Sequence, residues 1–481
     1  MPTSDHLRFG GGLSGTALHP IVMILSIIAI LLILALPRKY VVVPFLLAVF
    51  LTPFGQQLYV GGVHLFIPRI LILIGWVRIG LTPKSSQSGI ASGGFTLIDK
   101  VFICWAAFRA TATYLEFLEA GALINQCAFL WDTLGGFFLL RYLIRDEEDI
   151  LRVVRTFAFI VSLLAVTMLY EKLHGVNPFG YMGGKLEPMV RDGVIRSQGP
   201  FTGPIPAGTF AATILALFVW LWHSGKSRIL AAASIIGATV MVVTSASSTP
   251  LLAYLAVILG ILMLPLRGKM RVVRWGIVFL LIGLQLVMKA PVWFLINHIE
   301  FVSGNSGYHR AMIIDMCVRH FWDWWLIGVK STQDWGWDMW DQANQFVAEA
   351  EGGGLATLVC FVLLVSRSFG RLGSARKLVA GDNKKEWLLW LLGVALFSYL
   401  VSFFGISFSD QSQYAWFSLL AVISAATAPI LARETEALNQ TESRLTQAGL
   451  VESSLGVRFT GRKKPTTSCL RQTNSKAKGF S

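Results

Sequence analysis

The chain has few charged residues and few cysteines. Both features limit the class of protein to which it can belong. Only 14% of its 481 residues are charged and 54% are hydrophobic, whereas about a quarter of a soluble globular protein is charged. The five cysteines are scattered, without a disulfide framework or a Cys/His metal-binding spacing. No phosphate loop, nucleophile elbow or His-Glu-x-x-His motif occurs. These absences indicate an integral membrane protein without a recognisable metal or cofactor motif.

Long apolar stretches are what the chain has instead. A spanning helix needs about 20 residues including its interfacial ends. Thirteen stretches are compatible with spanning helices, the second of them being the weakest: 19–36, 40–54, 65–81, 97–115, 122–143, 156–172, 204–222, 229–247, 249–266, 273–290, 353–366, 387–406 and 414–432. We therefore predict an all-α polytopic membrane protein with about 13 transmembrane helices.

The distribution of Lys and Arg predicts the orientation of these helices. With alternating loops, 30 of the 41 basic residues fall on one side and nine on the other, and basic loops face the cytoplasm. The amino terminus is then outside and the carboxy terminus inside. The same bias accounts for the basic excess without a nucleic-acid partner. Only Arg8 precedes the first apolar stretch, so we expect a retained span rather than a signal peptide.

The predicted organisation has three parts. Residues 1–172 form amino-terminal transmembrane helices, and residues 173–432 form a core with long outer loops at 173–203 and 291–352. Residues 433–481 form a basic cytoplasmic tail that we expect to be disordered and weakly attracted to anionic lipid. The charged segment 145–155 is expected to lie along the inner membrane surface.

A polar, Trp-rich island at 309–355 interrupts the apolar pattern. It contains six of the 16 tryptophans, and Trp335, Trp337 and Trp340 alternate with aspartates, among them Asp341. Indole faces beside carboxylates suit a sugar, because the rings pack on its C–H face while polar groups bind its hydroxyls. Asn344 and Glu351 extend this candidate sugar site. The earlier tryptophans of the island could instead be interfacial belt residues.

Two pairs of residues in the outer loops are candidates for anion binding. Arg191 and Arg196 precede the span that begins near residue 204, where guanidinium groups suit a phosphate or pyrophosphate. The alternative is a salt bridge to Asp192 or Glu187. His309 beside Arg310 is a candidate acid/base and anion pair, although a lone His is more often structural.

Two arginines, Arg69 and Arg109, fall inside predicted spans. An Arg at membrane depth is costly and normally has a partner or a water-filled cavity. Both are candidates for substrate binding. An ion pair to one of three carboxylates is at least as good an explanation: Glu116, Glu119 or Asp132.

Four short blocks, in order, resemble the O-antigen ligase and polymerase superfamily of polytopic membrane glycosyltransferases. They are RSQGPFTGPIPAGTF, SGYHRAMIIDMCVRHFWDWWLIGV, DQANQFVAEAEGGGL and FGISFSDQSQYAWF, within about residues 190–420. The resemblance implies a GT-C-type fold with a large extracytoplasmic loop in the bacterial inner membrane. It also implies metal-independent, inverting transfer of a glycan from an undecaprenyl-diphosphate carrier to an acceptor glycan or lipid. By position, Arg196 and Arg310 would serve the diphosphate.

The chain departs from the family pattern at the position of a candidate catalytic base. The family usually has a His immediately before the Asn of the third block, and here Ala343 precedes Asn344. A base that deprotonates the acceptor hydroxyl must then come from elsewhere. Asp341 is our first choice, with Glu349, Glu351 and His309 as alternatives. The family His could also be a positioning group, in which case Asn344 suffices, or activity could be lost.

The sequence leaves three functions open. The first is a polymerase or ligase of surface polysaccharide, in which fixed guanidinium groups stabilise the departing diphosphate. The second is a transporter or flippase of an anionic lipid-linked glycan, which would use the same arginines without bond cleavage. The third is a non-catalytic subunit working with other polysaccharide assembly proteins. We expect the first.

Overall fold

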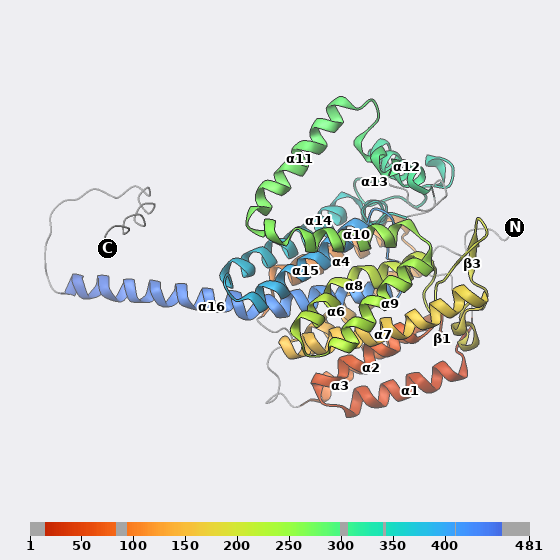
Figure 1. Ribbon diagram of the computed structural model, residues 1–481, viewed down its shortest axis with the longest axis horizontal. Helices are drawn as coiled ribbons and strands as arrows, with labels where there is room; N and C mark the ends of the chain where they lie inside the picture. Colours follow the sequence, from red (N-terminus) through yellow and green to blue (C-terminus); the bar gives the residue numbers. More distant parts are fainter. Residues whose placement is uncertain (1–14, 83–93, 299–305, 340–342, 409, 455–481) are drawn as a thin grey trace, which may run out of the picture. The chain divides into compact units, whose positions relative to one another are not determined.

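Helices make up nearly all of the fold, with two short hairpins beside them (Figure 1). The computed structural model describes residues 15–82, 94–298, 306–339, 343–408 and 410–454. The helices are α1 (Pro20–Ala35), α2 (Arg38–Leu51), α3 (Ile67–Leu81), α4 (Leu97–Phe117), α5 (Ala120–Leu130), α6 (Gly136–Leu143), α7 (Glu147–His174), α8 (Pro204–Ser224), α9 (Arg228–Ser245), α10 (Ser248–Leu262), α11 (Met270–Val287), α12 (Ser306–Arg319), α13 (Phe321–Trp324), α14 (Gln345–Leu378), α15 (Asn383–Ser402) and α16 (Ser412–Ser454). The antiparallel hairpins are β1 (Gln57–Val60) with β2 (Val63–Phe66), and β3 (Met189–Arg191) with β4 (Val194–Arg196).

The prediction of an all-α membrane protein is confirmed by the helical content of the structure and by its long apolar helices. Each of the thirteen predicted stretches lies wholly or mostly within a helical segment, although α7, α14 and α16 extend well beyond theirs. Within the described ranges, eight helical segments are long and apolar enough to cross a membrane: Ala120–Leu143, Glu147–His174, Pro204–Ser224, Arg228–Ser245, Leu264–Val287, Gln345–Leu378, Asn383–Ser402 and Ser412–Glu434. The first of these joins α5 to α6 through a π-helical turn at Trp131–Gly135.

The core gathers around α8, which is buried along most of its length between α7, α9, α10 and α15. Small residues permit this close packing. A Cβ on Gly208 would lie 2.6 Å from Ser245 Oγ, and one on Gly237 would lie 3.2 Å from the Val161 carbonyl. Backbones that approach so closely pack without a large apolar side chain between them. The turn after α9 is thereby fixed against the start of α8.

The connecting segments form two groups that meet at opposite ends of the helices. In one group, Phe54 N donates to the Pro200 carbonyl and Thr202 Oγ1 donates to Asp410. In the other, an Arg155 guanidinium donates to the Lys226 carbonyl. The ion pair of Arg267 with Glu386 belongs to the second group as well. The first group contains segments predicted to lie outside, and the second contains segments predicted to lie inside. Loops assigned to the same side of the membrane therefore contact each other in these examples.

Two local predictions differ from the structure. Residues 145–155 do not form a separate surface segment, because α7 begins at Glu147 with Asp146 as its N-cap and continues to His174. A cap and an acidic first turn start a helix well. Disorder was expected over residues 433–481, whereas α16 continues to Ser454; residues 455–481 lie outside the described residues. That stretch lacks Pro and is rich in Ala, Glu, Gln and Leu, which are good helix formers. The chain forms two compact units, residues 1–432 and 433–481.

Candidate functional site

Arg196 ends the β3–β4 hairpin and points into the protein. The hairpin turns at Asp192 and Gly193, which both have positive φ (53° and 75°), as a tight two-residue turn between strands requires. Arg196 is 8% exposed. Its Nη2 donates to Ser247 Oγ at 2.6 Å and its Nε lies 3.5 Å from the Ser245 carbonyl. The guanidinium therefore lies against the turn between α9 and α10.

The segment that follows Arg196 is fixed by buried polar contacts. Ser197 N donates to the Thr244 carbonyl at 3.0 Å. Glu171 of α7 accepts hydrogen bonds from Gln198 N and Gly199 N at 3.1 and 3.0 Å. A buried carboxylate that accepts several backbone N–H groups holds a loop firmly. Arg196 is consequently presented by a rigid backbone.

The Arg196 guanidinium has only neutral partners. Across the described ranges, no carboxylate lies within ion-pair distance of it, and both of its hydrogen-bonded partners are uncharged oxygens. Burial, and then the positive charge of Arg191, lower the pKa of Arg196. A buried charge without a counter-ion is costly. An anion bound beside Arg196 would relieve that cost, with phosphate or carboxylate best suited to the guanidinium fork.

Arg310 approaches the same turn from another part of the chain. It lies in α12 and is buried. A Cβ on Gly405 would lie 3.3 Å from Arg310 Nε, and Thr249 Oγ1 donates to the Gly405 carbonyl at 3.2 Å. Thr249 is two residues after Ser247, the partner of Arg196. The two arginines that the resemblance singled out therefore both border residues 245–249, Arg196 at Ser245 and Ser247 and Arg310 near Thr249.

His309 has an acidic neighbour that the sequence analysis did not select. His309 Nε2 lies 4.0 Å from Asp338 Oδ2, and both side chains are partly exposed. Asp338 has a positive φ of 60°, which Asp tolerates better than most residues. The signal in the sequence was weak, since Asp338 is one of several aspartates among the tryptophans. His309 and Asp338 form the described acid/base pair nearest in sequence to Arg310.

The tryptophans of the island divide into buried and open residues. Trp335 is buried and stacks on His320, with ring centroids 4.9 Å apart. Trp324 is buried and donates to the Cys317 carbonyl at 2.7 Å. Trp337, in contrast, is 87% exposed. Trp337 is therefore open to a ligand and Trp335 is part of the loop's own core. Trp340 and Asp341 lie outside the described residues.

Asn344 caps helix α14. Its Oδ1 accepts from Phe346 N at 2.9 Å and from Val347 N at 3.2 Å. Its Nδ2 is buried and has no hydrogen-bond partner among the residues described. A buried amide donor without a partner costs free energy. Asn344 thus has a structural role with one donor left over for a ligand.

Two of the proposed base candidates lie inside the protein. Glu349 is completely buried and accepts from Trp105 Nε1 at 2.9 Å and from Arg109 Nη1 at 2.7 Å. These two donors both contact Glu349 Oε2, and its burial keeps it away from an acceptor hydroxyl. Glu351 is buried as well, and its carbonyl accepts from Val329 N at 2.8 Å.

The two arginines within predicted spans each have a carboxylate partner. Arg69 forms a bidentate pair with Asp132, at 2.9 Å from Nε and 2.8 Å from Nη2 to Oδ2. This is one of the three partners considered from the sequence. Arg109 instead pairs with Glu349, because α4 packs along α14. Arg191 is half exposed and lies 3.8 Å from Asp192.

The arrangement contains no group of three or more His, Cys, Asp or Glu side chains able to hold a metal within the part of the chain that the structure describes. Comparison with protein-family models and with the sequences of curated proteins gives no match. A function for this protein therefore has to be inferred from its own side chains.

Proposed function

We propose that this protein is a membrane glycosyltransferase that polymerises or ligates surface polysaccharide. It would take a glycan from an undecaprenyl-diphosphate carrier and transfer it to an acceptor glycan. The observation that carries the proposal is the convergence of Arg196 and Arg310 on residues 245–249, where Arg196 is buried with neutral partners only. The resemblance of the four sequence blocks to the O-antigen ligase and polymerase superfamily points to the same arginines.

The reaction follows from the chemistry of the donor. The acceptor hydroxyl oxygen forms a bond to the anomeric carbon on the face opposite the diphosphate, and the bond from that carbon to the phosphate oxygen breaks. The diphosphate leaves with the electron pair, so negative charge grows beside the arginines, which stabilise it. The acceptor hydroxyl's proton passes to a base. His309 beside Asp338 is the described candidate, and Asp341 remains the sequence-based one.

The exposed indole of Trp337 gives the acceptor sugar a surface on which to pack. It follows Trp335 by two residues and adjoins Asp338, so an acceptor on this ring would lie near His309. We include thirteen spans, a GT-C-type fold and an outside amino terminus in the proposal. In that orientation the arginine site faces the outer leaflet of the inner membrane.

The test is the fate of the glycan in a deletion strain. The strain is complemented with wild type, Arg196→Ala, Arg310→Ala or Arg191→Gln at matched protein levels, and both surface polysaccharide and lipid-linked glycan are measured. We expect Arg196→Ala and Arg310→Ala to lower long-chain product at least about tenfold, because each removes a charge-assisted contact. Short lipid-linked repeats should accumulate on the outer leaflet. Arg191→Gln, on the same hairpin but half exposed, should stay near wild type.

Other outcomes would redirect the proposal. Repeats trapped on the inner leaflet would identify a flippase. Normal product from both Arg196→Ala and Arg310→Ala would remove these residues from the site. Loss of product in an Asp341→Asn strain, with His309→Gln unaffected, would assign the base to Asp341.

A further inference from the structure

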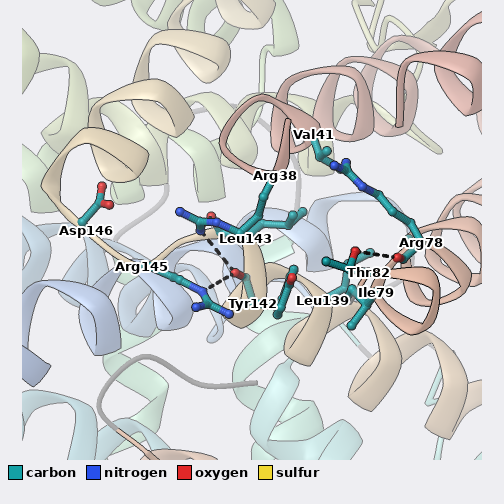
Figure 2. A pocket seen from close by; sticks show the side chains of 11 residues that line it. Arg38, Val41, Arg78, Ile79, Thr82, Leu139, Tyr142, Leu143, Arg145 and Asp146 are labelled. Carbon is teal, nitrogen blue, oxygen red and sulfur yellow. Dashed lines mark hydrogen bonds between the residues drawn. The ribbon is translucent and has the colours of Figure 1, made fainter. Parts of the chain in front are cut away.

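A second cluster of arginines surrounds a cavity at the other end of the helices. The cavity has a volume of about 400 Å³ and lies where α2, α3, α6 and α7 begin or end. Arg38, Arg78 and Arg145 line it together with Asp146. Figure 2 shows Arg38 and Arg145 on one side and Arg78 on the opposite side. None of these residues belongs to the candidate site described above.

The cavity has more positive than negative charge. Arg38 donates to Asp149 at 3.1 Å and to the Leu143 carbonyl at 3.1 Å. Asp149 is shared, because it also accepts from Arg152. Asp146 accepts from Asp149 N as the N-cap of α7. The two carboxylates are therefore already engaged with other groups.

Arg78 is the arginine of this cavity whose charge an anion would compensate most directly. Its guanidinium donates to the Ile33 carbonyl at 2.8 Å. In the described ranges no carboxylate lies within ion-pair distance of it. Across the cavity, Arg145 donates to the Tyr142 carbonyl at 3.0 Å. Burial, and then the charge of Arg38, lower the pKa of Arg145. Arg38 already has Asp149 as a counter-ion, so an anion in the cavity would chiefly compensate the charge of Arg78.

The rest of the lining combines aliphatic residues with Thr82 and Tyr142. Val41, Ile79 and Leu139 contribute aliphatic side chains to the cavity wall. Leu81, at the end of α3, is 76% exposed. Basic residues at the ends of spanning helices beside an apolar surface suit a phospholipid, with its phosphate among the arginines and its acyl chains along the helices. A second cavity of about 390 Å³ shares Arg145 and Asp146 and adds Lys385.

We propose that this cavity binds a phosphate group through Arg38, Arg78 and Arg145, and that its source is the headgroup of an anionic phospholipid. By the charge distribution of the loops, this end faces the cytoplasm, where anionic headgroups are abundant. The site does not depend on the glycosyltransferase proposal. It would anchor the amino-terminal helices to the inner leaflet whatever reaction the outer end performs.

The test uses the full-length protein purified in detergent. Phosphatidylglycerol, phosphatidylcholine or inorganic phosphate is titrated, and the shift of the thermal unfolding midpoint gives an apparent affinity. We expect phosphatidylglycerol to raise the midpoint of wild type and phosphatidylcholine to have no such effect. Arg78→Gln should weaken the apparent affinity about tenfold, because one charge-assisted contact is lost. The matched control is Arg274→Gln, an exposed arginine at the same end of the molecule.

The outcomes separate the two sources of phosphate. A shift by inorganic phosphate that equals the lipid shift and is lost in Arg78→Gln would support the phosphate site and assign its ligand to solution. A phosphatidylglycerol shift that is the same in Arg78→Gln, Arg274→Gln and wild type would overturn the proposal. If Arg78→Gln does not give folded protein, Arg145→Gln takes its place with the same expected loss.

Discussion

Arg141 and Arg196 are both buried arginines, but the charges around them differ. Arg141 of α6 is completely buried and donates to both oxygens of Asp99, at 3.0 Å from Nε and 3.1 Å from Nη2. Asp99 also accepts from Thr96 N at 2.7 Å, which closes the start of α4. Arg196 has Ser247 and a backbone carbonyl instead.

The difference separates structural charges from charges that are kept for a ligand. A buried ion pair with both partners present already has its charge compensated, and it fixes two helices relative to each other. A buried guanidinium with neutral partners keeps most of its desolvation cost until an anion arrives. By this criterion Arg69, Arg109 and Arg141 have their charges compensated within the fold, whereas Arg196 remains a candidate ligand-binding residue.

The largest expected effect is a loss of stability when the buried ion pair of Arg141 with Asp99 is broken. Asp99→Asn keeps the size of the side chain and leaves Arg141 as an uncompensated buried charge, which should cost about 3–5 kcal/mol of unfolding free energy. The measurement is denaturant unfolding of the purified protein in detergent. The double variant Asp99→Asn/Arg141→Met should recover most of the loss. The surface pair gives the control, because Asp192→Asn should change stability by less than about 0.5 kcal/mol. Equal losses in both single variants would contradict the distinction.

An intermediate effect, on binding rather than on stability, is expected at Arg196. Arg196→Met removes a buried charge that has no counter-ion, so the empty protein should be as stable as wild type or more stable. Its affinity for pyrophosphate, measured by calorimetry, should fall about tenfold or more. Arg191→Gln should lose much less. A destabilised Arg196→Met protein with unchanged pyrophosphate affinity would make Arg196 a structural residue like Arg141.

The smallest effect concerns Asp410, the acidic counterpart of Arg196. It is buried, and its described donors are the neutral groups of Thr202 and Ser412. Burial raises the pKa of Asp410 above its ordinary value, although these hydrogen bonds oppose the shift. The folded state therefore holds the proton more tightly than the unfolded state, and stability falls as pH rises from about 4 through the folded pKa.

Asp410→Asn cannot titrate and should escape this fall. As pH rises, the unfolding midpoint of wild type should therefore fall relative to that of Asp410→Asn. The difference between the two midpoints should become constant above the folded pKa. The measurement is thermal unfolding between pH 3.5 and 8, which are about the limits of carboxylate titration expected here. If the midpoint of wild type instead rises relative to that of Asp410→Asn as pH rises, Asp410 is stabilised as a carboxylate.

The helices could be predicted from the sequence because apolar length is a local property. Each predicted stretch lies wholly or mostly within a helical segment, although α14 and α16 are much longer than the stretches that predicted them. The start of α7 was misplaced because charges at helical spacing fit a surface helix as well as a capped spanning helix. The helix after residue 432 was missed because hydropathy does not report helix propensity.

The partners of the charged residues could not be predicted, because ion pairs join distant parts of the chain. Arg109 and Glu349 are 240 positions apart, and no spacing rule relates them. Arg38, Arg78 and Arg145 contributed only to the count of basic residues, and their common cavity emerges from helix packing. The convergence of Arg196 and Arg310 was expected from the resemblance alone. The residues 245–249 that bring them together gave no signal in the sequence.

Backbone hydrogen bonds fix both edges of the segment that contains Trp335 and Trp337. At one edge, Val329 N donates to the Glu351 carbonyl at 2.8 Å, where Gly328 leaves no room for a Cβ. At the other, Gln345 N donates to the Phe403 carbonyl at 2.8 Å. Contacts between backbones do not depend on the side chains in between. Both ends of the segment are therefore anchored by backbone groups, so an exposed side chain such as Trp337 can be exchanged while both anchoring hydrogen bonds remain.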